Sequence, residues 1–129
     1  MRLQGQVAMI TGVSHAGQVG YALTAAFARE EAHLAISAHK AERVKARAEE
    51  LRAQGANVIV IPADLTTEEG VQMLAQETLA AYGHIHMPVN LAGGLTRYGP
   101  PDELRLADWE AELNNNLRTA LCLPAREYI

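Results

Sequence analysis

A glycine-rich segment near the start of the chain has the residue types and spacing of a phosphate-binding turn. Residues 11–20 read Thr-Gly-Val-Ser-His-Ala-Gly-Gln-Val-Gly, after a short apolar run and at the opening of a helical pattern. Glycines let a backbone approach a pyrophosphate closely, and a helix N-terminus offers unpaired N–H groups and a positive dipole end. Glycine spacing alone is a weak indication, but its place between strand and helix favours phosphate binding over a plain glycine-rich connection.

A second group of polar side chains follows the next apolar run. Residues 36–40 read Ile-Ser-Ala-His-Lys, without an acidic residue. An acid at this point would accept the ribose hydroxyls of NAD, whereas nearby cations suit the extra phosphate of NADP. Ser37, His39 and Lys40 are therefore predicted to favour NADP over NAD, the alternative being that His39 and Lys40 form a solvated loop.

The remaining candidates for chemistry are two histidines, His84 and His86, which stand two residues apart. On a strand this spacing places both on one face. A metal ion would need a third ligand, and none is evident in the sequence. Surface histidines are the favoured interpretation, and no metal is predicted.

These residues must be positioned by strands and helices that alternate along the chain. Apolar runs predict buried strands at Val7–Ile10, Leu34–Ser37, Val58–Ile61 and within Ile85–Leu91. Periodic patterns predict helices at Val19–Glu31, Ala41–Leu51, Thr66–Tyr82 and from Leu106 onward. The first helix would bury Val19, Ala22, Leu23, Ala26 and Phe27, and the third would begin with a capping box of Thr66 and Glu69. The alternation predicts one α/β domain over residues 1–129, a Rossmann-like doubly wound parallel sheet with strand order 3-2-1-4.

Four segments in register resemble the short-chain dehydrogenases/reductases. These segments are Thr11-Gly12, Asp64, Asn90-Leu91-Ala92-Gly93, and Trp109 followed by Asn116-Leu117. They stand in the family's order and at its intervals, and the resemblance covers essentially the whole chain. It implies NAD(P)-dependent oxidoreduction and the cofactor-binding, N-terminal portion of such an enzyme.

The resemblance also implies roles for individual residues. Residues 12–20 would wrap the pyrophosphate, Asp64 and Leu65 would meet the adenine, and residues 90–93 would line the nicotinamide side. Asn116 would be the family's active-site asparagine, which supports a water relay to the catalytic lysine. Together with the 2′-phosphate candidates, the predicted cofactor residues are Gly12, Ser14, His15, Gln18, Val19, Gly20, Ser37, His39, Lys40, Asp64, Leu65, Asn90, Ala92 and Gly93.

The sequence departs from the family pattern at several positions. The glycine turn is two residues longer than usual, a length that matches the enoyl-reductase-like branch, and Gln18 stands where the second glycine would be. Leu91 replaces the usual second asparagine, Asn115 replaces a usually apolar residue, and Pro88 falls inside the fourth predicted strand.

The family's proton-transfer pair, a tyrosine with a lysine four residues later, is missing from this sequence. Its two lysines are Lys40 and Lys45, and Ile36 and Ala41 stand four residues before them. The two serines, Ser14 and Ser37, both lie in cofactor-side segments. We expect a truncated chain without turnover of its own; the alternatives are a non-catalytic dinucleotide-binding or interaction module and a decayed fragment.

Composition limits the remaining function classes. The 129 residues are 49% apolar with a net charge of −4, a globular composition without the basic face that nucleic acid requires. The single cysteine, Cys122, fits a reducing cytoplasmic compartment, and no apolar run approaches the length of a membrane span. We expect a homo-oligomer, because the fourth strand would be an open edge and Leu117, Leu121 and Cys122 an uncovered apolar face.

Overall fold

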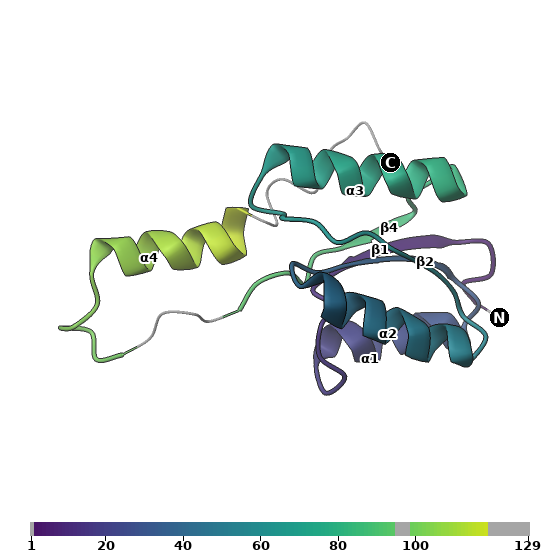
Figure 1. The fold of residues 1–129 in the computed structure, drawn as a ribbon, viewed down its shortest axis with the longest axis horizontal. Coiled ribbons are helices and arrows are strands. Elements are labelled where there is room, and N and C mark those ends of the chain that lie inside the picture. Colours follow the sequence, from purple (N-terminus) through teal and green to yellow (C-terminus); the bar gives the residue numbers. More distant parts are fainter. Residues whose placement is uncertain (1, 95–98, 119–129) are drawn as a thin grey trace.

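The computed structural model describes residues 2–94 and 99–118, and its centre is a parallel four-stranded sheet. The strands are β1 (Val7–Thr11), β2 (His33–Ser37), β3 (Asn57–Val60) and β4 (Met87–Val89). Their order is β3-β2-β1-β4, which confirms the predicted order and the doubly wound α/β class (Figure 1). Every residue of β1 is buried, which explains why this strand is a continuous apolar run and not an alternating one.

Helices cover both faces of the sheet. Helices α1 (Val19–Arg29) and α2 (Ala41–Ala53) lie on one face, and α3 (Glu68–Tyr82) lies on the other (Figure 1). Alternate residues of the central strands enter two separate clusters: Ile10 and Ile36 pack on the side of α2, whereas Met9 and Ala35 pack on the side of α3. The strands all end at the same edge, where the glycine-rich turn begins.

The first helix buries only part of the predicted face: Phe27 packs against the core cluster, whereas the first turn departs from the prediction. Val19 is 69% exposed and Ala22 is also exposed, whereas Gly20 and Thr24 are buried. Helix α1 approaches the glycine turn so closely that a Cβ at Gly20 would collide with the carbonyl oxygen of Gly12. This close approach places Gly20 and Thr24 inward and leaves Val19 facing outward.

The other two helices largely follow their sequence patterns. In α2 the buried residues are Val44, Ala48 and Leu51, and in α3 they are Val71, Leu74, Ala75 and Thr78. The predicted cap of α3 is wrong by one residue, because Thr67, not Thr66, accepts the N–H of Gly70. The Thr66 hydroxyl is turned to the carboxylate of Asp64 instead. Gly83 ends the helix with a φ of 80°, as a left-handed cap.

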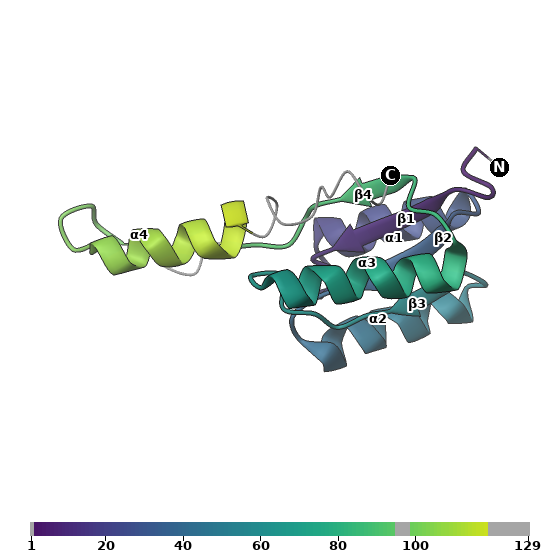
Figure 2. The ribbon, with the colours of Figure 1, turned by 90° about the horizontal axis from the view of Figure 1, so that it is seen from above.

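Helix α4 (Leu106–Leu113) extends away from the sheet and contains no buried residue (Figure 1, Figure 2). It continues into a π-helix, η1 (Asn114–Arg118), so the predicted regular helix widens at the run of three asparagines. Leu106, Trp109 and Leu117 are 69%, 60% and 62% exposed. The predicted apolar face is therefore uncovered as far as the structure describes it, and Leu121 and Cys122 lie outside the described residues. None of the described helices is long and apolar enough to cross a membrane.

Candidate functional site

A cleft of about 580 Å³ lies at the carboxyl ends of the four strands. The segments that follow β1, β2, β3 and β4 all contribute to it, and the π-helix closes one side. Ligands of open α/β sheets generally bind at this edge, outside the carboxyl ends of the strands. The lining residues are Gly12, Ser14, His15, Gln18, Ala38, His39, Lys40, Arg43, Ala63, Asp64, Leu65, Thr66, Leu91, Ala92, Gly93, Gly94, Asn114 and Asn115.

The floor of the cleft is formed where the end of β1 meets the segment after β4. Gly12 has a φ of 78°, and a Cβ on it would collide with the backbone of Leu91. The buried hydroxyl of Thr11 accepts the N–H groups of Leu91 at 3.1 Å and Ala92 at 3.0 Å, and donates to the Val89 carbonyl at 3.4 Å. Thr11 and Gly12 thus hold the two backbone segments together and leave backbone, not side chain, facing the cleft.

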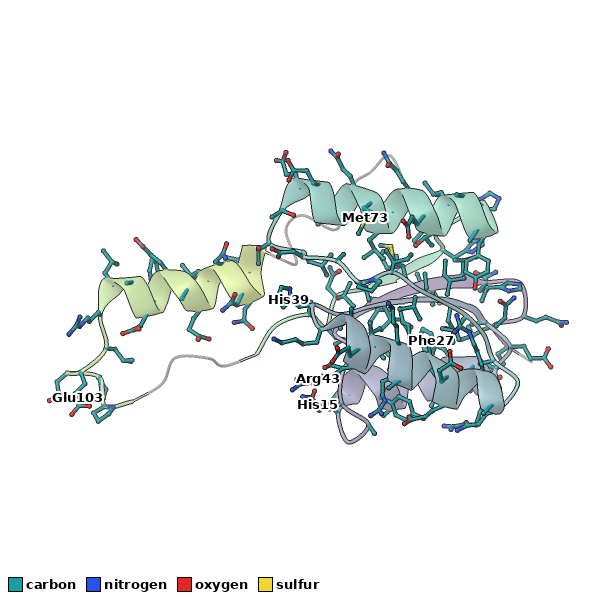
Figure 3. All side chains as sticks on the ribbon, viewed as in Figure 1. His15, Phe27, His39, Arg43, Met73 and Glu103 are labelled. Carbon is teal, nitrogen blue, oxygen red and sulfur yellow. The ribbon has the colours of Figure 1, made fainter. Side chains whose placement is uncertain are left out.

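One rim of the cleft carries positive charge. His39 and Lys40 follow β2, and Arg43 extends from the first turn of α2 to place its Nη1 3.0 Å from Nε2 of His15 (Figure 3). A guanidinium can only donate, so the imidazole nitrogen of His15 accepts this hydrogen bond. The residue at the end of β2 that would need to be acidic for NAD is Ala38. The end of β2 therefore offers donors, and no carboxylate of its own, to a ligand.

The segment after β3, which is hydrogen-bonded to the segment after β2 through Ala63 and Ala38, carries a carboxylate with a lowered pKa. Asp64 Oδ1 accepts the hydroxyl of Thr66 at 2.6 Å and the backbone N–H of Thr66 at 3.0 Å. The Thr66 hydroxyl, followed by its N–H, lowers the pKa of Asp64 below its ordinary value. A smaller coulombic effect of the nearby His39 acts in the same direction. The wall beside Leu65 thus presents a fixed hydrogen-bond acceptor.

The π-helix is attached to the rest of the site by Asn116. Its Oδ1 accepts the N–H of Gly94 at 2.9 Å, and its Nδ2 donates to the Gly94 carbonyl at 3.1 Å and the Glu112 carbonyl at 2.9 Å. Asn114 and Asn115 line the cleft, whereas Asn116 lies beside it. The predicted active-site asparagine is therefore a clamp between the segment after β4 and α4, and its proposed part in a water relay stays a prediction.

The structure brings most of the predicted cofactor residues to one place and leaves four out. Those on the cleft are Gly12, Ser14, His15, Gln18, His39, Lys40, Asp64, Leu65, Ala92 and Gly93. Ser37 was expected to contact a phosphate, but its side chain is fully buried and its hydroxyl has no hydrogen-bond partner among the described residues. Val19, Gly20 and Asn90 do not line the cleft either.

Six of the lining residues are not predicted from the sequence, and Arg43 is the most consequential of them. Arg43 stands in the first turn of α2 after Lys40, at the same end of the sheet. That position is a signal that could have identified it. The others are Ala63, Thr66, Gly94, Asn114 and Asn115.

The paired histidines lie at the other end of the sheet from the cleft. Their ring centroids are 5.4 Å apart, but both residues precede β4, so they do not share a face of a strand as predicted. In the described part of the chain, no three His, Cys, Asp or Glu side chains come close enough together to hold a metal ion.

Comparisons with known proteins give a consistent picture. The family model of the short chain dehydrogenases matches residues 6–126. A (2S)-[(R)-hydroxy(phenyl)methyl]succinyl-CoA dehydrogenase subunit from Thauera aromatica is 36% identical over 126 residues, which are 97% of this chain and 50% of the relative. A D-threitol dehydrogenase from Mycolicibacterium smegmatis is 34% identical over 116 residues, 90% of this chain and 44% of the relative.

Solved structures show the same relationship. A short-chain dehydrogenase/reductase from Burkholderia xenovorans superposes with a TM-score of 0.87 at 32% identity, over 99% of this chain and 51% of the other. A metagenomic short-chain oxidoreductase in complex with NADP gives a TM-score of 0.85 at 29% identity, over 95% of this chain and 55% of the other. The chain thus spans about half the length of the relatives that it matches.

Proposed function

Because this chain belongs to the short-chain dehydrogenase family, we propose that the cleft at the carboxyl ends of its strands binds NADP. The observation that carries the proposal is the pairing of a glycine turn with a rim of cations at the end of β2. Arg43 and Lys40 supply positive charge there, His39 adds a hydrogen-bonding ring, and Ala38 leaves no carboxylate at the end of β2 itself. Arginine and lysine are the usual partners of a phosphate group, so NADP is favoured over NAD.

The residues present fit such a cofactor. At Gly12 the backbone is free of a Cβ, which allows the close approach that a pyrophosphate needs, and α1 begins just beyond it. Asp64 and Leu65 would lie on the adenine side, and Ala92 and Gly93 on the nicotinamide side. When bound, the cofactor supplies hydride transfer; the protein residues named here bind and orient it.

Calorimetric titration of the 129-residue chain with NADPH and with NADH tests this proposal. We expect binding of both, with the tighter dissociation constant for NADPH. Equal affinities would contradict the assignment of the cationic rim, and an NADH preference would contradict it as well. The absence of any binding would contradict the cofactor site as a whole.

We further propose that this chain, taken alone, binds the cofactor without measurable turnover. No tyrosine in it is followed four residues later by a lysine, and Asn116 is engaged with Gly94 and Glu112. Loss of a proton-transfer group removes about 10² to 10⁴ in rate. Sustained oxidation of NADPH by the pure chain with a panel of ketones would contradict this proposal.

A second candidate function is a non-catalytic dinucleotide-binding or interaction module. The observation in its favour is the uncovered apolar surface of Leu106, Trp109 and Leu117, beside a cofactor cleft without a proton-transfer pair. Exposed apolar patches of this kind favour association, so we propose a homo-oligomer. Light scattering over a range of concentrations tests this, and a stable monomer at high concentration would contradict it.

A further inference from the structure

Two pairs of rings, His33 with Tyr82 and His84 with His86, lie at the edge of the sheet where the strands begin, opposite the cleft. His33 opens β2, and His84 and His86 lead into β4, while Tyr82 closes α3. None of these side chains lines the cofactor cleft. Their hydrogen bonds show how the two inner strands are joined to the edge strand.

His86 makes two hydrogen bonds to one residue of the central strand. Its backbone N–H donates to the Val7 carbonyl at 3.0 Å, and its ring Nδ1 accepts the Val7 N–H at 2.8 Å. A backbone amide can only donate, so this contact requires an unprotonated Nδ1. The pair of bonds fastens the beginning of β4 to the beginning of β1. Since β4 has three residues and one of them is Pro88, few other ladder bonds hold this edge strand.

His33 has a superficially similar contact that adapts to protonation. Its Nδ1 lies 2.6 Å from Asn57 Nδ2, and Asn57 Oδ1 accepts the Tyr82 hydroxyl at 3.2 Å. Rotation of the Asn57 amide by half a turn would offer its oxygen to a protonated His33 ring. The backbone amide of Val7 has no such freedom, which singles out His86.

We propose that His86 is an acid-sensitive latch that fastens β4 to β1 when its ring is neutral and releases it when the ring is protonated. A protonated Nδ1 would direct an N–H at the N–H of Val7, so two donors would face each other. Histidine is the side chain whose charge changes in the mildly acidic range. A proton and the Val7 N–H compete for the same lone pair on Nδ1, so the latch is open wherever that nitrogen is protonated.

The charged and titratable groups around this edge act in the same direction or are already paired. The His84 ring, on the same segment, is in contact with His86, and a charge on both rings would be repulsive. From β2 and α3, the His33 and Tyr82 rings pack on each other. Before β1, Arg2 is paired with Glu30.

Release of the latch would reach the cofactor cleft through the strand itself. Strand β4 ends at Val89, and the chain continues directly into Leu91 and Ala92, which line the cleft.

The same geometry argues against a metal role for the histidine pair. A metal ion on Nε2 of His86 would place the ring proton on Nδ1, and the bond from Val7 would be lost.

Amide hydrogen exchange of the 129-residue chain tests the latch, with the Val13 amide, which donates to the Ser37 carbonyl, as an internal reference. The measured quantity is the ratio of the protection factor of the Val7 amide to that of the Val13 amide, each corrected for its intrinsic exchange rate. This ratio is compared at about pH 7.5 and about pH 5. We expect a loss of about tenfold for the native chain at the lower pH, the equivalent of one hydrogen bond.

Three variants make the result decisive. In His86→Asn the side-chain oxygen can accept from Val7 and does not titrate, so protection should be high at both pH values. In His86→Leu it should be low at both, and His84→Asn, the matched control, should keep the pH dependence of the native chain. Protection of Val7 that is independent of pH in the native chain would overturn the proposal. An unchanged pH dependence in His86→Asn would overturn it equally.

Discussion

Replacement of Arg43 by methionine should weaken the binding of NADPH and leave the binding of NADH nearly unchanged. Arg43 stands on the cleft rim with its guanidinium 3.0 Å from the His15 ring, which fixes its position before a ligand arrives. Methionine keeps the length of the side chain and removes the charge. The only part of NADP that NAD lacks is the 2′-phosphate, so a difference between the two cofactors reports on the phosphate alone.

The size of the effect follows from the exposure of the side chain. Hydrogen bonds to charged groups contribute about 1.5–3 kcal/mol when they are sheltered, and exposed ion pairs contribute about 1 kcal/mol or less. Arg43 is exposed but fixed by His15. We therefore expect a loss of about 1–1.5 kcal/mol, which is about a five- to tenfold increase in the Kd for NADPH. The effect should shrink as salt is added, because screening acts on an exposed pair.

Isothermal titration calorimetry with both cofactors gives the required comparison. The matched control is Lys45→Met, which removes a cation from the same helix at an exposed position outside the cleft. It should leave both affinities within about twofold, since a distant surface charge is largely screened. An equal loss of NADH affinity in Arg43→Met would refute the reasoning. A loss of NADPH affinity in Lys45→Met as large as that in Arg43→Met would show that net charge, not this site, determines the preference.

Three further substitutions follow from the geometry. Gly12→Ala should lower the melting temperature and abolish NADPH binding in calorimetry, because it combines about 1–2 kcal/mol of left-handed strain with a collision at Leu91; native-like binding would contradict this. Glu31→Gly should raise the free energy of unfolding in urea by about 0.5 kcal/mol, because Glu31 has a φ of 64° and glycine relieves that strain. The gain is partly offset because glycine gives the unfolded chain more conformational freedom. A lower stability of the variant would contradict this expectation. Thr66→Val should raise the pKa of Asp64 toward its ordinary value in a carbon-13 NMR titration, because the largest cause of the lowered pKa is removed. The stability that the ionised carboxylate contributes is present at neutral pH and lost as the pH falls, and in the variant it should be lost at a higher pH. An unchanged pKa would refute the assignment.

The sheet and the cleft could be predicted because they depend on patterns that are local and regular. Apolar runs of strand length alternate with helical stripes, and parallel connections allow few topologies, so the order β3-β2-β1-β4 followed. Residues just after each strand then had to meet at one edge. That is why His39, Asp64 and Ala92, far apart in the sequence, were all placed correctly on the cleft.

The errors arose where contacts between elements override the local pattern. Val19 looked like a core residue by spacing, but the close packing of Gly20 on Gly12 turns it outward. Ser37 was read as a cleft residue because it ends a strand, yet alternation along the strand points its side chain into the interior. The pairing of Arg43 with His15 joins helix α2 to the loop before α1, and no periodicity indicates such a contact.

Amide chemical-shift mapping of the nitrogen-15-labelled chain during titration with NADPH tests most directly whether the cleft is a dinucleotide site. The largest shifts should fall on the amides of Gly12, His39, Asp64 and Ala92, which line the cleft from the ends of four different strands. The amides at the opposite edge, such as those of His33 and His86, should shift little. Shifts concentrated at that opposite edge, or no shifts at millimolar NADPH, would contradict the assignment of the site.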